Sequence, residues 1–166
     1  MKKIAQFSKV SYVEFKTAFD QMTDDEIKVI YDNISLPQRA TIASAGYDFF
    51  LPFDIVLKPN ETIKIATGIR VKMDNNWVLK LYPRSGLGFK YRLQLNNTVG
   101  IIDADYYNSD NEGHIFAKIT NDSNENKTLQ LKANEGFMQG IFLEYGITVD
   151  DSVSAVRNGG FGSTSK

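Results

Sequence analysis

The sequence predicts an all-β domain, an antiparallel barrel or jelly roll, preceded by a short helical segment. From Leu36 onward, apolar and polar residues alternate with the period of two that is typical of half-buried strands. Turn-forming segments, such as KPNE around Pro59 and DSNENK at 122–127, separate these runs, and no long helical pattern lies between them. The chain has 166 residues and no cysteine, and this length suffices to bury a core without disulfides.

Residues 8–34 predict two short amphipathic helices. Ser11 with Glu14, and Thr23 with Glu26, each match the spacing of a capping box. Apolar residues follow at helical spacing, namely Tyr12, Phe15 and Phe19 in the first helix and Ile27, Ile30, Tyr31 and Ile34 in the second. We expect these helices to pack on the body of the protein, and the alternative is an arm that binds a partner protein.

The alternation predicts six strands, each bounded by turn residues. They centre on Ile63/Ile65, Ile69/Val71/Met73, Trp77/Leu79/Leu81, Leu93/Leu95, Ile115/Ala117/Ile119 and Leu129/Leu131. Many short strands without intervening helices indicate one antiparallel β domain. The expected organisation is a helical extension at 1–35, a β core at 36–156 and a mobile glycine-rich arm at 157–166.

Composition excludes several classes of function. The formal net charge is −1 and the basic residues are scattered, which argues against a general nucleic-acid binder. The absence of cysteine excludes thiol nucleophiles and thiolate zinc sites, and one histidine, His114, argues against a histidine-based metal site. No apolar run reaches membrane-spanning length or forms a signal peptide, so we expect a soluble cytoplasmic protein.

The stretch NTVGIIDADYY at 97–107 combines an apolar strand with crowded carboxylates. Val99, Ile101 and Ile102 favour a buried strand, and Asp103 and Asp105 follow at once. Carboxylates beside an apolar strand are costly unless they have a role, although a surface turn that caps a hairpin is the alternative.

Three other segments join glycine with polar groups. YPRSGLGFK places Arg84 beside Ser85 and Gly86, so that a forked cation, a hydroxyl and exposed N–H groups could hold a phosphate. SAGYDFFLP at 44–52 and RNGGFGSTSK at 157–166 read alone as a turn and a disordered tail.

Taken together, the chain closely resembles the trimeric dUTPase family, in its Gram-positive bacterial or phage type. Five strings occur in the order of that family between about Leu36 and Ser165, namely AGYDFFLP, PRSGLG, NTVGIIDADYY, FMQGIF and RNGGFGSTS. The resemblance implies a β-clip or jelly-roll subunit and a homotrimer with three active sites shared between chains. It also implies hydrolysis of dUTP to dUMP and pyrophosphate, which limits uracil in DNA and supplies dUMP for dTMP synthesis.

The resemblance assigns a role to each matching residue. Asp103 corresponds to the carboxylate that orients and deprotonates the attacking water, and Asp48 to an aspartate that helps hold a hydrated Mg²⁺. The substrate-binding residues it implies are Arg84, Ser85 and Gly86 for phosphates, Asn97, Gly100, Ile101 and Ile102 for uracil, Tyr106 for the sugar, Gln139 near the α-phosphate, and the arm residues Arg157, Phe161, Gly162 and Ser163, with Arg157 acting from a neighbouring chain.

The chain also departs from the family pattern. Asn134 and Ser165 stand where glycine is usual, Met138 stands where alanine is usual, and Asn108–Gly113 forms a longer hairpin tip than the single usual glycine. Two alternatives remain open. One is a dCTP deaminase-like enzyme, and the other is a regulatory protein on the same fold, such as a phage protein that binds a repressor, with 8–34 as its arm.

Overall fold

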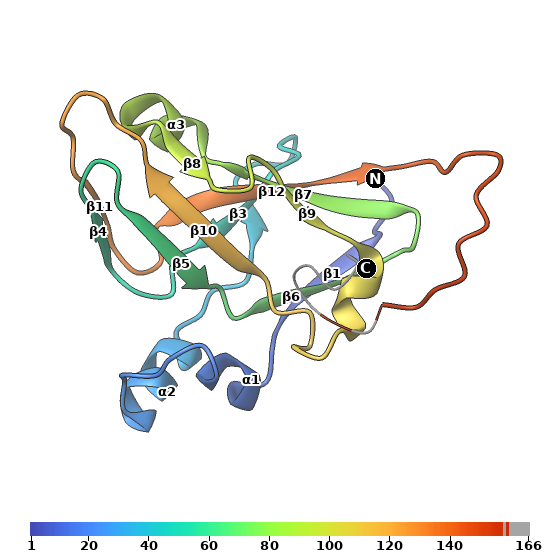
Figure 1. The fold of residues 1–166 in the computed structure, drawn as a ribbon, viewed down its shortest axis with the longest axis horizontal. Helices are drawn as coiled ribbons and strands as arrows, with labels where there is room; N and C mark the ends of the chain where they lie inside the picture. The colour runs from blue at the N-terminus through green and yellow to red at the C-terminus, as the bar shows by residue number, and fades with distance from the viewer. Residues whose placement is uncertain (158, 160–166) are drawn as a thin grey trace.

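The computed structural model describes residues 1–157 and 159, and every structural statement here concerns that part of the chain. Short strands form the body, and two helices near the N-terminus lie on one side of it (Figure 1). The elements in chain order are β1 (Ala5–Lys9), α1 (Tyr12–Lys16), α2 (Asp24–Asp32), β2 (Gln38–Arg39), β3 (Tyr47–Phe50), β4 (Ile55–Leu57), β5 (Thr62–Ala66), β6 (Ile69–Met73), β7 (Trp77–Pro83), α3 (Ser85–Tyr91), β8 (Leu93–Leu95), β9 (Gly100–Ile102), a 3-10 helix (Ala104–Asn108), β10 (Phe116–Asn121), β11 (Leu129–Leu131) and β12 (Gly136–Glu144).

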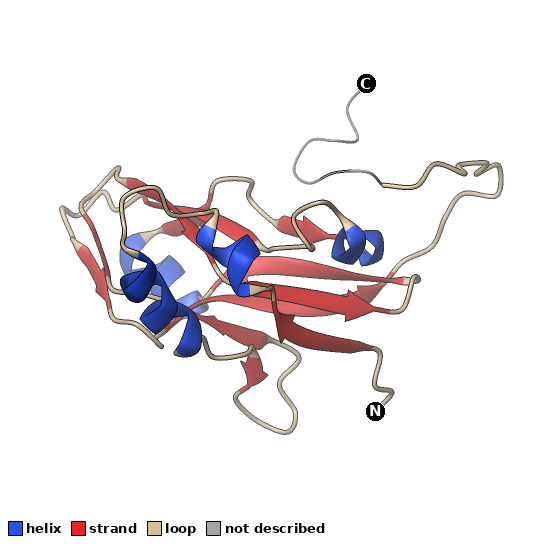
Figure 2. Cartoon of the chain, turned by 90° about the horizontal axis from the view of Figure 1, so that it is seen from below, coloured by secondary structure: helices blue, strands red, loops and turns tan. Residues whose placement is uncertain are grey.

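The predicted all-β jelly-roll fold is confirmed. Each of the six strands expected from the alternating pattern is present, as β5, β6, β7, β8, β10 and β11. All the pairings between described strands are antiparallel, and the largest sheet has the order β2-β3-β12-β7-β9. A second sheet has the order β5-β10-β8, and two-stranded sheets join β1 to β6 and β11 to β4. Figure 2 shows the longer strands running side by side, with helices near their ends.

The core lies between these sheets, because alternate residues of each strand point inward. β10 shows the pattern directly, since Ala117 and Ile119 are buried while Lys118 is exposed. The largest fully buried side chains include Phe49, Phe137, Leu79, Ile65 and Leu129. Close packing of this kind fixes the strand register, and the register in turn places the polar residues at the strand ends.

Both predicted N-terminal helices are present, and a strand precedes them that the sequence did not predict. Thr23 and Glu26 form the complete capping box of α2. β1 pairs with β6 along its whole length, with Phe7 opposite Val71. The alternation in AQFSK was too short to stand out from the helical pattern around it. The N-terminal segment is therefore tied to the β body by a strand, and the division of the chain at residue 35 stays a prediction.

A third helix, α3, occupies the glycine-rich segment that the sequence suggested could hold a phosphate. Two glycines within SGLGFKY lower its helical propensity, so local sequence gave little signal. The helix begins after Arg84 and ends at Arg92, whose backbone is left-handed with φ 49°. No helix among the described residues is long and apolar enough to cross a membrane.

Candidate active site

Two carboxylates lie where β9 ends. Asp103 directly follows Ile102 and caps the 3-10 helix, and its side chain is 50% exposed. Arg157 donates from Nη2 to Asp103 Oδ2 over 2.6 Å and from Nε to Asp105 Oδ1 over 2.9 Å. The carboxylate predicted as the catalytic base is thus open to solvent on one side and paired with the arginine of the arm on the other.

The arm returns to its own chain in this structure. After β12 the chain runs away from the body and comes back toward the 3-10 helix, the short yellow helix in Figure 1. Two acidic side chains, two positions apart, offer the guanidinium of Arg157 two charged acceptors, which explains this placement. The sequence led us to expect Arg157 in the site of a neighbouring chain; the contact within one chain differs from that expectation, and action in a neighbouring chain stays a prediction.

Tyr106, predicted to pack on the sugar, is almost fully buried. Its side chain is 5% exposed, and its hydroxyl turns inward to donate to the carbonyl oxygen of His114 over 2.7 Å. The guanidinium of Arg157 lies 5.8 Å from the ring centre. Burial raises the pKa of the Tyr106 hydroxyl above its ordinary value. Only a small part of the ring is therefore available to a ligand, while the rest belongs to the core.

The segment predicted to read uracil forms a corner between two sheets. β8, before Asn97, pairs with β10, whereas β9, after it, pairs with β7. Gly100 lies opposite Leu81, and a Cβ atom on this glycine would lie 3.0 Å from the Leu81 Cβ, so a larger residue would push the strands apart. Of the predicted contacts, Ile101 is half exposed and Ile102 is buried, so the Ile101 side chain faces outward. β9 is an edge strand among the described strands, so one edge of its backbone has no neighbouring strand.

A second group of predicted residues gathers around the middle of the large sheet. Gln139 on β12 lies between Asp48 on β3 and Tyr82 on β7 in the strand register. Arg84 Nε lies 3.4 Å from Asp48 Oδ1, and Gln139 Nε2 lies 3.4 Å from the carbonyl oxygen of Pro83. The structure therefore brings together the arginine, the amide and the aspartate that the sequence assigned to phosphate and metal.

Two glycines give these polar side chains their space. A Cβ atom on Gly46 would lie 2.7 Å from Gln139 Oε1, and one on Gly136 would lie 2.6 Å from Arg84 Nη1. Both contacts are shorter than real Cβ atoms make, so these glycines allow the amide and the guanidinium to lie flat against the sheet. Ser85 and Gly86 open α3 beside them and are exposed. A Cβ atom on Gly86 would meet nothing within 4 Å, so its backbone is open to approach.

The two groups lie at opposite ends of strand β7. Ile102 is opposite Leu79 near the start of β7, so Asp103 extends toward Trp77, whereas Arg84 directly follows the other end at Pro83. At about 3.3 Å per residue, the five to six positions between them correspond to roughly 20 Å. Figure 1 shows the same separation, with α3 and the 3-10 helix at opposite ends of the body. One nucleotide cannot contact both groups of the same chain unless it spans this distance.

Two pockets of the described chain lie apart from Asp103 and Arg84. One of about 440 Å³ is lined by Asn97 together with Lys64, Asn96, Phe116 and Lys118. Another of about 460 Å³ lies between α1 and β5. Neither lining includes Asp103 or Arg84.

The sequence did not indicate two features near the site, and three of the predicted substrate residues lie outside the described residues. Asp105 was noted in the acidic turn but given no role, although its place two residues after Asp103 was the available signal. The contacts of His114 with Glu14 gave no signal, because 100 residues separate the two in the chain. Phe161, Gly162 and Ser163, the remaining predicted substrate residues, lie outside the described residues.

Comparisons with known proteins agree on one family. The family model described as dUTPase matches residues 32–165. The deoxyuridine 5'-triphosphate nucleotidohydrolase of Lactococcus lactis is 38% identical over 144 residues, covering 84% of this chain and 95% of that protein. The corresponding protein of Tolumonas auensis is 34% identical, covering 87% of this chain and 99% of that protein.

Solved structures extend this agreement to the fold. The crystal structure of dUTPase from Streptococcus mutans has a TM-score of 0.64 and 32% identity, covering 86% of this chain and 97% of that chain. The dUTPase of Staphylococcus bacteriophage 80alpha with dUPNHPP has a TM-score of 0.66 at 22% identity, covering 98% and 99%, and it supports the fold alone. On the family match and these relatives, the chain belongs to the dUTPase family.

Proposed function

We propose that this protein hydrolyses dUTP to dUMP and pyrophosphate, with Asp103 as the general base. Membership of the dUTPase family supports the substrate. The observation that carries the assignment of the base is the exposed carboxylate of Asp103 at the end of β9, beside the cationic arm. A water molecule attacks the α-phosphorus, Asp103 takes up its proton, and the bond from the α-phosphorus to the bridging oxygen breaks to release pyrophosphate.

His114 supports this assignment by being unavailable as a base. Its side chain is fully buried, and its Nε2 accepts a hydrogen bond from the Gly68 N–H over 3.0 Å. Burial lowers the pKa of His114 to about 4, with the charge of Lys64 acting in the same direction. The chain has no other histidine and no cysteine, so a carboxylate is the remaining group for general-base catalysis near pH 7.

Recognition of the nucleoside is assigned to the chain that provides Asp103. Asn97 and the backbone at Gly100–Ile102 would pair with the uracil edge, so that cytosine meets mismatched donors and acceptors. Tyr106 would lie against the sugar at the position of a 2′-hydroxyl, which favours a deoxynucleotide. The substantial burial of Tyr106 supports this role, because a ring that cannot move aside excludes an added hydroxyl most strongly.

Recognition of the phosphates is assigned to a different chain. Arg84, Ser85, Gly86 and Gln139 would bind them, and the separation of roughly 20 Å from Asp103 along β7, at about 3.3 Å per residue, supports placing the two groups in adjacent subunits. A closed ring of three chains would join each Asp103 end to a neighbour's Arg84 end, so we propose a homotrimer with shared sites. The arm, with Arg157, Phe161, Gly162 and Ser163, would close over phosphates and base.

Mg²⁺ is the proposed metal, bound mainly by the nucleotide. Among the described residues, no three His, Asp or Glu side chains gather closely enough to hold a metal ion. The Asp48 carboxylate, whose Oδ1 faces Arg84, would accept a hydrogen bond from a metal-bound water. This donor set fits a hard cation that keeps its waters and takes phosphate oxygens, with Asp48 acting through water. Such an ion neutralises phosphate charge as pyrophosphate leaves.

The wider role follows from the reaction. Removing dUTP limits uracil incorporation into DNA, and dUMP is the precursor for dTMP synthesis. A cytoplasmic location is part of the proposal and is supported by the lack of cysteine. A regulatory role through residues 8–34 stays a prediction, since the likeness to phage proteins at 22% identity extends to the fold alone. The dUTPase family match gives no support to the deaminase alternative.

Hydrolysis in water enriched in ¹⁸O tests the site of attack. Attack on the α-phosphorus places the label in dUMP and leaves pyrophosphate unlabelled. Mass spectrometry of both products shows which of them carries the label. Label in pyrophosphate would show attack on the β-phosphorus and would contradict the proposed mechanism.

A further inference from the structure

The hairpin tip, defined as Asn108–Gly113, holds Tyr106 from several sides. Asn111 Nδ2 donates to the Tyr106 hydroxyl over 2.9 Å, and Ser109 Oγ donates to the Tyr106 carbonyl oxygen. Gly113 packs so closely that a Cβ atom there would lie 2.8 Å from the same carbonyl oxygen. Together with the bond from the Tyr106 hydroxyl to the His114 carbonyl, these contacts make the tip the immediate support of the Tyr106 ring.

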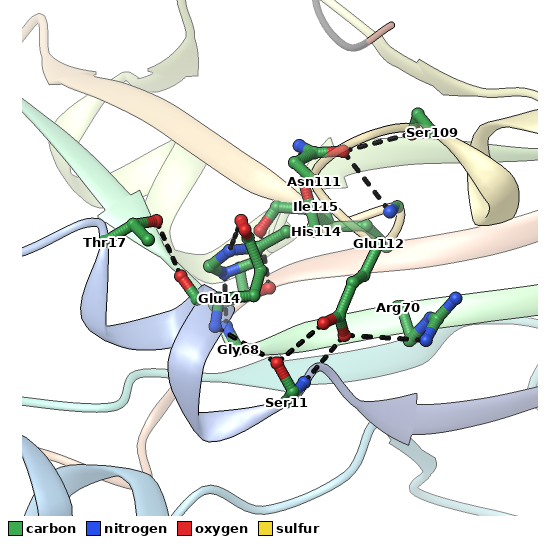
Figure 3. Close-up of polar contacts among 12 residues, drawn as sticks. Ser11, Glu14, Thr17, Gly68, Arg70, Ser109, Asn111, Glu112, His114 and Ile115 are labelled. Carbon is green, nitrogen blue, oxygen red and sulfur yellow. Dashed lines mark hydrogen bonds and ion pairs between the residues drawn. The ribbon is translucent and has the colours of Figure 1, made fainter. Parts of the chain in front are cut away.

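The start of helix α1 holds the hairpin tip in turn (Figure 3). Ser11 donates to the Glu112 carboxylate twice, from its N–H over 2.8 Å and from its hydroxyl over 2.6 Å. Glu112 has a left-handed backbone with φ 56°, which a residue with a side chain rarely adopts. Such a conformation persists where surrounding contacts fix it, and Ser11 supplies those contacts from the N-terminal segment.

A second link joins α1 to the residue after the tip. Because His114 Nε2 accepts from the Gly68 N–H, the proton of the neutral ring is on Nδ1, which lies 3.2 Å from Glu14 Oε1 and donates to it. The ring of His114 is fully buried, so this donor has no access to water. Removing the Glu14 acceptor would leave a buried N–H without its partner, and the structure would have to shift to satisfy it.

The predicted capping box at Ser11 is thereby only half formed. Ser11 Oγ accepts from the Glu14 N–H over 3.1 Å, but the Glu14 carboxylate turns to His114 and does not return to the Ser11 N–H. The Glu112 carboxylate accepts the hydrogen bond from the Ser11 N–H instead. Both departures from the local pattern connect α1 to the segment that carries Tyr106, and both involve residues before the range that the family model matches.

We propose that Glu14 and Ser11 are positioning residues for Tyr106, so that the N-terminal segment sets how strictly the site distinguishes dUTP from UTP. This inference rests on the proposed function. Glu14 fixes His114, Ser11 fixes Glu112, and the tip between them fixes the ring that excludes a 2′-hydroxyl. Asp103 precedes the 3-10 helix and stays attached to β9, so loosening the ring affects sugar discrimination more than the chemical step.

The test compares three variants of the full-length protein. Glu14→Ala removes the acceptor for His114, whereas Glu14→Gln keeps a side-chain oxygen that can accept from Nδ1. Thr23→Ala is the matched control, because it removes the cap of α2 in the same N-terminal segment and its side-chain contacts lie within that helix. The readouts are kcat/KM for dUTP and for UTP, and hydrogen exchange of the peptide covering 104–113.

We expect Glu14→Ala to lower the ratio of kcat/KM for dUTP over UTP by about tenfold, the change that follows from losing one ordering contact. Exchange at 104–113 rises in the same variant, Glu14→Gln restores both readouts, and Thr23→Ala leaves both near those of the wild type. An unchanged ratio and exchange in Glu14→Ala, or equal changes in Thr23→Ala, would overturn the inference. Wild-type protein that fails to hydrolyse dUTP would overturn the proposed function instead, while exchange at 104–113 still decides whether Glu14 orders this segment.

Discussion

Arg157 Nη2 lies 2.6 Å from Asp103 Oδ2, so the cation of the C-terminal arm and the proposed catalytic base form an ion pair within one chain. The pair holds the Asp103 carboxylate at the end of β9 with one guanidinium nitrogen. It also places the arginine predicted to bind phosphate directly beside the proposed site of water activation. Arrival of a triphosphate would offer Arg157 a more highly charged partner and free the carboxylate for its role as a base.

Replacing Asp103 by asparagine should abolish most turnover while nucleotide binding remains. An amide cannot accept the proton of the attacking water, so kcat should fall by roughly 10²- to 10⁴-fold, the usual effect of losing a general base. Steady-state kinetics with dUTP and calorimetric binding of a non-hydrolysable analogue measure the two effects separately. Asp20→Asn, at an exposed position between α1 and α2, is the control. Near-normal kcat in Asp103→Asn would remove this residue from the mechanism.

Two inactive variants should complement each other if the sites are shared. Asp103→Asn damages one end of the large sheet and Arg84→Ala damages the other. In a ring of three chains, every mixed trimer contains one site with both residues intact, so about one third of the wild-type activity should return. The two chains are coexpressed with different tags and purified through both. Mixed trimers that stay inactive would place Asp103 and Arg84 in the same site of one chain.

Acidification should destabilise the protein through His114. The folded pKa is lowered to about 4, below the unfolded value near 6.5. Above pH 6.5 the ring is neutral in both states; as the pH falls toward 4, only the unfolded chain gains the proton, so the free energy of unfolding decreases. Between pH 7 and 5 the loss should be about 2 kcal/mol.

Three charged groups near His114 also affect how the free energy of unfolding depends on pH. Glu14 from α1, Glu112 from the hairpin tip and Lys64 from β5 face the ring. Burial raises the pKa of Glu14, which opposes the loss once the pH reaches the carboxylate range. Denaturant unfolding of wild type and His114→Gln at equal protein concentration, at pH 7 and pH 5, isolates the histidine. Equal pH dependence in the two proteins would contradict the assignment.

Phe161 should contribute to nucleotide binding by covering the base. It lies outside the described residues, and the expectation comes from the sequence. Stacking of an aromatic ring on a base is worth about 1 to 3 kcal/mol, so Phe161→Ala should weaken binding of a non-hydrolysable dUTP analogue by roughly 5- to 150-fold. Phe161→Trp keeps a stacking surface and should retain most of the affinity. Unaltered affinity in Phe161→Ala would show that this residue does not contact the base.

Six of the twelve described strands were predictable from alternation, because that pattern is local. Alternation located β5 through β8 and β10 through β11, since one face of each strand packs on the core. β1 was missed because five residues carry too little alternation, and α3 was missed because its glycines disfavour helix in the absence of tertiary contacts. Local sequence also suggested that Glu14 would close a capping box, whereas its partner in the fold is His114.

The candidate site was predictable in its residues but not in its arrangement. Motif order identified Asp48, Arg84, Asp103 and Gln139, and the fold places three of them together. The separation of Asp103 from Arg84 depends on the register of β9 against β7, which long-range packing determines. The support of Tyr106 by Ser11 and Glu112 joins residues 101 positions apart, so no local pattern could indicate it.

Pyrophosphate release by the wild-type protein from dUTP, dCTP, dTTP and UTP with Mg²⁺ decides whether the protein is a dUTP-specific hydrolase. We expect rapid release from dUTP and a kcat/KM lower by roughly 10⁴-fold for dCTP, because buried groups that pair with uracil would be left unpaired by cytosine. We also expect weak release from dTTP, whose methyl group does not fit, and from UTP, whose 2′-hydroxyl meets Tyr106. Absence of release from dUTP, or comparable kcat/KM values for dUTP and dCTP, would contradict the proposed function.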